Sequence, residues 1–287
     1  MLVLVGAAIV IVSVLGGFLL NGGAVHTLVQ PTEWLIIFGA AIGSFVIANP
    51  KKVVLGTGAA LKLLLRGSRH NKASYLETLG LLYSLFKLAK TKGDLALESH
   101  VEKPDESAIF SRYPGFNGDH HTREFLCDYL RLLTLGTNNA HEVEAIFDAE
   151  IEAHHHRETA VAEAITRISD AMPALGIVAA VLGVINTMGS ITQPPEVLGE
   201  LIGGALCGTF MGVLMSYGFF APIGQALSGI HQTETDYLGC IKACLLAHMM
   251  GYAPQVSIEF GRKTLDYDLR PSFFELEEVV SATAAAE

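Results

Sequence analysis

The chain has 287 residues, of which 51% are hydrophobic and only 17% are charged. An average soluble domain carries roughly 25% charged residues, so this composition disfavours an ordinary soluble domain. The formal net charge of −10 at pH 7 argues against a protein that binds nucleic acid.

Four windows of the sequence are apolar and long enough to cross a bilayer, which takes about 20 helical residues. In chain order they are Leu2–Leu20, Trp34–Asn49, Ala171–Ile191 and Leu201–Ala221. The second is the shortest and reaches full length only if Thr32 and Glu33 lie in the interface region. One such window alone would also fit a buried helix of a soluble protein, but four together favour a multi-pass membrane protein.

The charges between these windows predict their orientation, because short loops rich in Lys and Arg stay in the cytoplasm. The segment after the second window has no acidic residue and carries Lys51, Lys52, Lys62, Arg66, Arg69 and Lys72. The loop of residues 21–31 has neither Lys nor Arg, and the loop of residues 192–199 has only Glu196. We therefore predict that both short loops lie outside and that both termini are cytoplasmic.

The long segment between the second and third windows is predicted to be helical. Apolar residues recur at helical spacing in ASYLETLGLLYSLFKLAKTKG, which ends at Gly93, and in HTREFLCDYLRLLTLGTNN, where the pattern stops at Gly136. A further amphipathic segment, AHEVEAIFDAEIEAHHHRETAVAEAITRISD, leads into the third window.

These patterns predict an all-α integral membrane protein with four transmembrane helices and a helical cytoplasmic domain inserted between spans 2 and 3. We place the first two spans and a short periplasmic loop in residues 1–50, and the cytoplasmic domain in residues 51–170. The third and fourth spans occupy residues 171–226. A cytoplasmic tail of residues 227–287 follows, with a short helix expected in SFFELEEVVSATAAAE.

Small residues form a stripe on the fourth span. They recur every four residues and are Gly204, Gly208, Gly212 and Ser216. Such stripes let helix backbones approach closely in lipid, so we expect dense helix packing, either within the chain or between copies of it.

None of the four windows contains an Asp, Glu, Lys, Arg or His, and Glu33 and Glu200 are expected at their outer edges. Proton relays at membrane depth usually need an ionisable group, so a partner subunit would have to supply it. Thr209 would then help to line the ion path, because a hydroxyl both donates and accepts hydrogen bonds. The alternative is that Thr209 bonds back to its own helix.

Two prolines lie at matching depths, Pro173 at the cytoplasmic end of the third span and Pro222 at that of the fourth. Proline breaks the helical hydrogen-bond ladder and can kink or end a helix. One interpretation is a simple boundary marker, and the other is a hinge that relays motion between membrane and cytoplasm.

The sequence resembles the MotA family of flagellar stator proteins, of the proton-coupled type, over nearly its whole length. In the first half the resemblance rests on GGFLLNGG and IGSFVIANP. In the spans and the tail it rests on PALGIVAAVLGVI, GTFMGVLMSYGFFAPI, GYAPQVSIEFGRKTL and RPSFFELEE.

The resemblance implies a subunit of the bacterial inner membrane that forms a ring, taken to be a pentamer, in the lipid around its partner MotB. MotB supplies the membrane aspartate that binds the proton, and proton flow turns the ring against the rotor protein FliG. Neither an enzymatic activity nor a cofactor is implied, apart from the proton as coupling ion.

The resemblance also implies roles for individual residues. The rotor-facing charged pair falls on Lys90 and Glu98, with Glu150 as a further contact to FliG; the family commonly has arginine at the first position. Thr209 and Tyr217 match channel-side positions. Ala180 stands where sodium-coupled relatives tend to have an extra hydroxyl, so it favours protons. Pro173 and Pro222 match the family's conformational-coupling prolines. Without the resemblance, the charged residues would be assigned to a solvated helical face.

Two histidine clusters, His154–His156 and His120–His121, invite a metal-site interpretation. Consecutive helical residues point in different directions, so we expect the first cluster on a solvated helix face. We expect His120 and His121 in a loop, and predict no metal site. No Ser-His-Asp arrangement, P-loop or dinucleotide fingerprint is present, which disfavours an enzyme.

Two other functions stay open at this point. An energy-coupling subunit of the ExbB/TolQ type would normally have three spans, so the four spans and the tail motif argue against it. A non-transporting membrane scaffold would use its small-residue stripes only for assembly.

Overall fold

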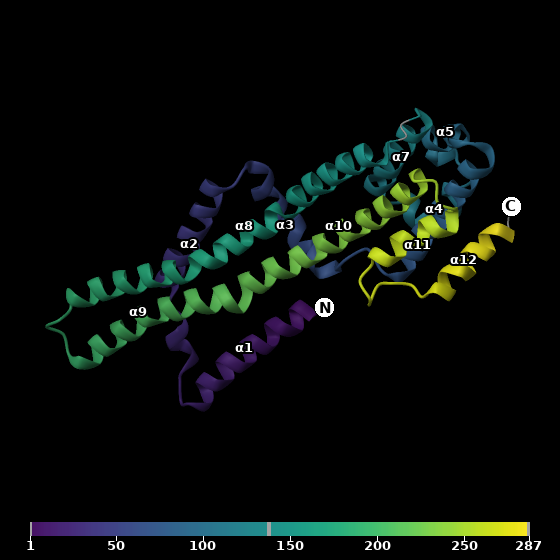
Figure 1. The fold of residues 1–287 in the computed structure, drawn as a ribbon. Helices are drawn as coiled ribbons and strands as arrows, with labels where there is room; N and C mark the ends of the chain where they lie inside the picture. The colour runs from purple at the N-terminus through teal and green to yellow at the C-terminus, as the bar shows by residue number, and fades with distance from the viewer. Residues whose placement is uncertain (1, 137–138, 286–287) are drawn as a thin grey trace. The chain divides into compact units, whose positions relative to one another are not determined.

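The computed structural model describes residues 2–136 and 139–285 (Figure 1). These residues form helices, turns and loops, and no strand occurs in them. Four helical stretches are long and apolar enough to cross a membrane. The predicted fold class, an all-α membrane protein with four transmembrane helices, is confirmed.

The chain divides into two compact units. The first comprises residues 1–67 and 157–231, and the second comprises residues 68–156 and 232–287. Two of the three boundaries fall inside long helices, α8 (Ala140–Met188) and α10 (Ala221–Met249). The predicted domain boundaries follow expected membrane crossings rather than compactness, so they stay predictions.

The first unit holds the apolar helices together with the basic helix α3. Its elements are α1 (Leu2–Leu20), η1 (Val25–Leu28), α2 (Pro31–Ala48), α3 (Lys51–Arg66), the second part of α8, α9 (Pro195–Met215), the π-turn η5 (Ser216–Phe220) and the start of α10. α1 begins and ends at the same residues as its predicted window. No side chain of α1 is buried within the described chain, as suits a helix that is apolar on all sides and faces lipid.

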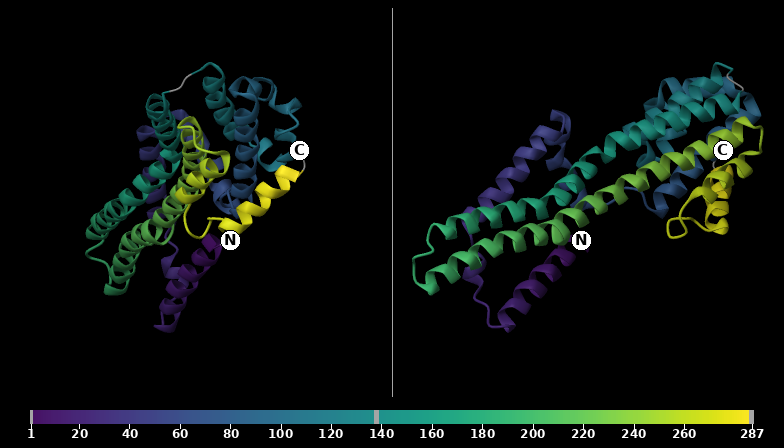
Figure 2. Two further views of the ribbon diagram at one scale, coloured as in Figure 1. Left: turned by 45° about the vertical axis from the view of Figure 1, so that its right-hand side comes forward. Right: turned by 60° about the vertical axis from the view of Figure 1, so that its left-hand side comes forward.

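Close approach of two backbones holds the first unit together. α8 and α9 run side by side in Figures 1 and 2. A Cβ added to Gly212 would lie 2.7 Å from the carbonyl oxygen of Met172 and 2.9 Å from the Cα of Gly176. A Cβ on Gly208 would lie 3.1 Å from that of Ala179. The predicted small-residue stripe is therefore a packing surface within the chain.

The second unit is built around α4 (Lys72–Lys92), which is buried from Leu79 to Phe86. Its other elements are η2 (Asp94–Leu97), α5 (Glu98–Glu102), η3 (Pro104–Glu106), η4 (Phe110–Arg112), α6 (Pro114–Asn117), α7 (His120–Thr134), α11 (Pro254–Thr264), α12 (Phe273–Ala285) and the remaining parts of α8 and α10. α4 packs against η2, α11 and α12.

Local signals set both ends of α4. Asn71 and Ser74 form a reciprocal capping box at its start. Gly93 ends it with a φ of +86°, a left-handed conformation that side chains other than glycine rarely adopt. Gly136 has a φ of +84° just after α7, so both predicted stop signals are confirmed.

The histidine predictions were wrong in two places. His120 and His121 lie in the first turn of α7 rather than in a loop. His154 is buried, with its ring centroid 4.2 Å from that of His121, and His155 bonds to Thr235. His154 thus contacts α7 and His155 contacts α10, so these two rings pack against other helices instead of facing solvent.

The close approach of α8 and α9 predicts that substitutions of two glycines on α9 differ in their effect on stability. Gly212→Ala should lower the stability by about 1–3 kcal/mol, because the added Cβ meets backbone atoms that cannot move aside. Gly203→Ala is the matched control on the same helix, since a Cβ there would have nothing within 4 Å. Thermal unfolding of the two purified variants in detergent should separate them, and equal melting temperatures would contradict this account of the packing.

Candidate functional site

Lys90 and Glu98 lie on neighbouring exposed parts of the second unit. Lys90 is in the last turn of α4, and Glu98 is the first residue of α5. Both are exposed, whereas Ala89 and Leu97 beside them are buried. Buried apolar anchors thus alternate with exposed charges across the turn at Gly93. This arrangement can present the two charges to a partner, which is the role that the resemblance implies for them.

The position of α5 depends on a residue that the sequence analysis missed. Arg131 of α7 donates from Nε to Glu102 Oε1 at 2.7 Å and from Nη1 to Asp128 Oδ1 at 2.7 Å. Val101, on the same short helix as Glu102, is buried in the core. The ion pair and this anchor hold the helix that carries Glu98. A helical spacing pattern cannot reveal such a pair, because its members lie 29 residues apart.

Glu150 takes part in a different contact. It lies on α8 and accepts a hydrogen bond from the Tyr129 hydroxyl at 2.6 Å. The Tyr129 ring stacks on Phe147, with centroids 3.4 Å apart. Burial, followed by the hydrogen bond to Glu150, raises the pKa of Tyr129 well above its ordinary value. Glu150 is thus bound to α7, and its predicted contact with the rotor stays a prediction.

The predicted channel residues divide into two environments. Ala180 and Thr209 lie where α8 and α9 meet: a Cβ on Gly208 would be 3.4 Å from the Ala180 nitrogen, and one on Gly176 would be 3.3 Å from the Thr209 Cα. Tyr217 lies in the π-turn and is 68% exposed. The structure brings the first two to one helix interface and leaves the tyrosine on the surface of this chain.

Glu33 lies at the end of its span, as expected, but it is buried within the chain. It belongs to the first turn of α2, and only 8% of it is exposed. Its Oε2 lies 2.9 Å from where a Cβ of Gly208 would be, and its Oε1 lies 3.3 Å from that of Gly183. Oε2 has no hydrogen-bond partner within the described residues. The glycines leave room for this carboxylate between α2, α8 and α9. Its burial could not be predicted from any single window, because it depends on residues of three helices.

Both prolines lie inside helical structure rather than at helix ends. α8 runs through Pro173, and Pro222 sits in the first turn of α10, directly after η5. Because proline has no N–H, the carbonyl four residues earlier loses its helical donor. For Pro173 that residue is Ser169. Neither proline ends its helix, and their role as hinges stays a prediction.

A pair of serines links the two proline regions. The Ser169 hydroxyl donates to the carbonyl oxygen of Ser216 at 3.0 Å, and the two hydroxyl oxygens are 3.2 Å apart. Both serines are fully buried. The same Ser216 carbonyl accepts the N–H of Ala221, which is the long bond of the π-turn. Nothing in the spacing of either span marked this pair, because the serines lie 47 residues apart.

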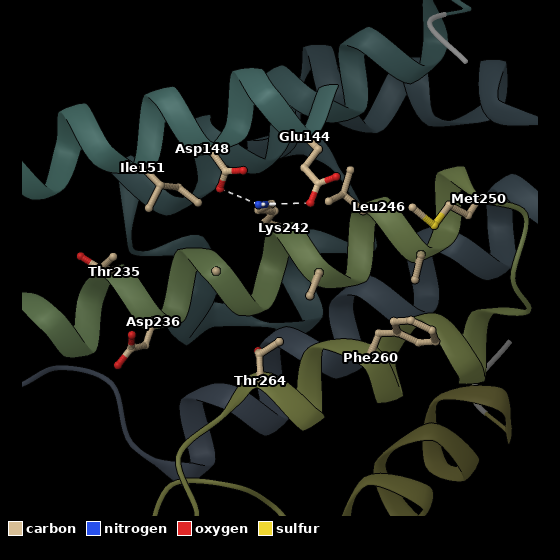
Figure 3. A pocket seen from close by; sticks show the side chains of 13 residues that line it. Glu144, Asp148, Ile151, Thr235, Asp236, Lys242, Leu246, Met250, Phe260 and Thr264 are labelled. Atoms are coloured by element: carbon tan, nitrogen blue, oxygen red, sulfur yellow. Dashed lines mark hydrogen bonds and ion pairs between the residues drawn. The ribbon is translucent and has the colours of Figure 1, made fainter. Parts of the chain in front are cut away.

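The second unit also has a pocket of about 500 Å³ between α8, α10 and α11 (Figure 3). Its lysine, Lys242, lies 2.5 Å from Asp148 Oδ1 and 3.7 Å from Glu144 Oε1. Figure 3 shows the amino group held between the two carboxylates. The apolar part of the lining includes Met250 and Phe260. The lysine is already paired, so its role here is to join α8 to α10.

Comparison with known proteins gives a consistent result along the chain. Residues 4–93 match the family model of the motility protein A N-terminal region, and residues 117–239 match that of the MotA/TolQ/ExbB proton channel family. The chain is 44% identical over 282 residues to motility protein A of Escherichia coli strain K12, covering 98% of this chain and 96% of the relative. It is 33% identical to chemotaxis protein LafT of Vibrio parahaemolyticus, covering 95% and 96%.

Solved structures have the same fold. The flagellar MotAB stator complex from Bacillus subtilis contains a chain that superposes with a TM-score of 0.74 at 26% identity, covering 96% of this chain and 98% of that one. The C. jejuni MotAB structure gives a TM-score of 0.77 at 23% identity, covering 95% and 98%. With the sequence identity found over nearly all of its length, the chain belongs to the MotA family of motility proteins.

Proposed function

We propose that this chain is the MotA subunit of a flagellar stator. With a MotB-like partner it forms a proton-conducting complex that converts proton flow into torque on the rotor protein FliG. The observation that carries this proposal is the 44% identity to motility protein A over 98% of the chain. Such a match spans the apolar helices as well as the unit that bears Lys90 and Glu98. The protein is then an ion-driven motor subunit rather than an enzyme.

A two-component channel is supported by what the spans contain. Their described polar groups are hydroxyls and amides, apart from Glu33 at the start of α2 and Glu196 and Glu200 at the start of α9. Since proton relays use an ionisable group at depth, the partner's membrane helix supplies the carboxylate that titrates. Ala180 and Thr209, at the α8–α9 interface, form the wall beside it.

Assembly of several copies is supported by the apolar surface of the first unit. The side chains of α1 are largely exposed, and Leu182 and Ile185 of α8 are 47% and 62% exposed. In a ring around the partner, some of these side chains contact neighbouring copies and the rest face lipid. A ring also gives the exposed Tyr217 a position facing another chain. We take the number of copies, five, from the family.

The proposed location is the bacterial inner membrane, with both termini in the cytoplasm. Its support is the charge of α3, which begins with Lys51 and Lys52 and ends with Arg66. Basic residues at this position hold the end of α2 at the cytoplasmic face. The second unit, with its exposed charges, is then in the cytoplasm and within reach of the rotor.

An energy-coupling subunit of the ExbB/TolQ type is the second candidate, because the model matched by residues 117–239 is shared with those proteins. The match of residues 4–93 to the motility protein A N-terminal region favours the stator.

A complementation experiment tests the proposal directly. We expect swimming of a cell that lacks its own stator to be restored when this chain is produced together with a MotB-like partner. Either protein alone should restore nothing, because the carboxylate and the rotor-facing charges are on different chains. Swim-ring diameter on soft agar is the measurement. A proton leak caused by this chain alone would contradict the two-component channel.

Charge reversal tests the proposed rotor contact. The double variant Lys90→Glu, Glu98→Lys should reduce swimming several-fold while its membrane level is unchanged, because complementary charges at an exposed interface guide association. The control is Lys103→Glu, Glu106→Lys, which reverses a neighbouring exposed pair bonded at 3.1 Å and keeps the two charges opposite. Normal swimming of the first variant, with FliG unchanged, would count against the assignment.

The serine link tests conformational coupling between the proline regions. Ser169→Ala removes the donor to the Ser216 carbonyl, and one buried hydrogen bond contributes about 1 kcal/mol. We expect lower torque at high load with assembly retained, measured from the rotation speed of tethered cells. Ser44→Ala is the control, since the Ser44 hydroxyl donates to the Ala41 carbonyl of its own helix. Unchanged torque in Ser169→Ala would show that the link does not transmit motion.

A further inference from the structure

A pocket of about 390 Å³ lies beside Lys90 in the second unit. The last turn of α4 forms one side with Lys90, and the start of η2 forms another with Asp94. α7 contributes Leu133, and the end of α10 contributes His248. The pocket therefore joins a predicted rotor contact to a histidine that is far from it in the sequence.

His248 is held inside this pocket by packing. Its side chain is only 8% exposed, and its ring stacks on Phe86 with centroids 4.3 Å apart and planes 7° from parallel. Nε2 lies 4.0 Å from Asp94 Oδ1. Nδ1 is buried and finds no hydrogen-bond partner in the described part of the chain. The ring is thus fixed against an apolar neighbour, with a carboxylate close to its Nε2 atom.

Two charged groups act on this histidine. They are the Asp94 carboxylate from η2 and the Lys90 ammonium from α4, while α7 faces it with the apolar Leu133. Burial, the largest cause, lowers the pKa of His248 below its ordinary value; Asp94 raises it and Lys90 lowers it further. The ring is accordingly neutral at neutral pH.

The direction of the pH effect follows from this balance. A histidine whose pKa is lowered by the fold takes up a proton more readily when released from it, so the buried, stacked arrangement loses stability as the pH falls below about 6.5. A protonated ring repels Lys90 and attracts Asp94. The local structure can keep the charge only if the ring moves towards that carboxylate.

We propose that His248 is a proton-responsive positioning residue for the rotor-facing surface: when protonated it binds Asp94 and displaces Lys90, which weakens the contact with the rotor. This inference rests on the proposed stator function and adds to it a regulation by cytoplasmic pH. The pocket thereby gains a regulatory role, which is distinct from the proposed direct contact of Lys90 and Glu98 with the rotor. The sensing group is separate from the channel, because every residue of the pocket belongs to the second unit.

The test uses the full-length chain with its partner in cells that lack a stator. Cytoplasmic pH is lowered with a membrane-permeant weak acid from about 7.5 to about 5.5, which extends below the ordinary pKa of histidine because the fold lowers that of His248. The rotation speed of tethered cells is measured for the wild type, His248→Asn and His141→Asn. His141 is the matched control because its side chain is 88% exposed on α8.

We expect the wild type and His141→Asn to lose speed several-fold more steeply on acidification than His248→Asn, which has no titrating ring. Asp94→Asn should shift the loss to lower pH, because the carboxylate that favours the charged ring is gone. Identical profiles for the wild type and His248→Asn would overturn this inference alone. A wild type that drives no rotation at any pH would overturn the proposed function as well.

A second measurement does not depend on any variant. Deuterium exchange at the histidine C2 position, followed by mass spectrometry of the purified complex, reports the titration of each histidine. His248 should titrate at lower pH in the folded complex than after denaturation, because burial disfavours its charged form. Equal titration in the two states, or titration at higher pH in the folded complex, would overturn the inference.

Discussion

The contact between the backbones of α8 and α9 is the constraint on which the first unit depends. In lipid there is little hydrophobic driving force between helices, so van der Waals packing must hold them together. Gly176 and Gly212 permit an approach that any side chain would prevent. The same approach places Ala180 beside Gly208 and Thr209 beside Gly176, and it leaves a space for the Glu33 carboxylate. The same small residues therefore determine both the packing of the two helices and the lining of the candidate ion path.

The second unit solves a different problem, which is how to display charge from a firmly held frame. α4 is buried through its middle, so its two ends reach the surface, and the last turn carries Lys90. Glu98 is displayed by a short helix that is anchored on one side by Val101 and on the other by Arg131. Rigid support matters for binding a partner, because an exposed charge gains little from an ion pair unless the geometry of that pair is held.

Features that depend on nearby residues could be predicted from the sequence, and those that depend on distant ones could not. The ends of α4 and α7 follow from Gly93 and Gly136, because a left-handed glycine is a local signal. α1 follows from an unbroken apolar run. The burial of Glu33 and His154 was missed, since each is decided by glycines or rings from another helix. The roles of Lys90 and Glu98 came from the resemblance to the family and not from their spacing.

The π-turn at Ser216 has a consequence for how the sequence of this region can change. Each residue of a helix turns the chain by about 100°, so one extra residue within a turn rotates everything that follows. Gly208, Gly212 and Ser216 face α8, and beyond them Gly224 faces the same helix at Thr166. Losing a single residue here would give a regular α-helix but turn the later face away from its partner. Insertions and deletions between Met215 and Ala221 should therefore be far less tolerated than substitutions.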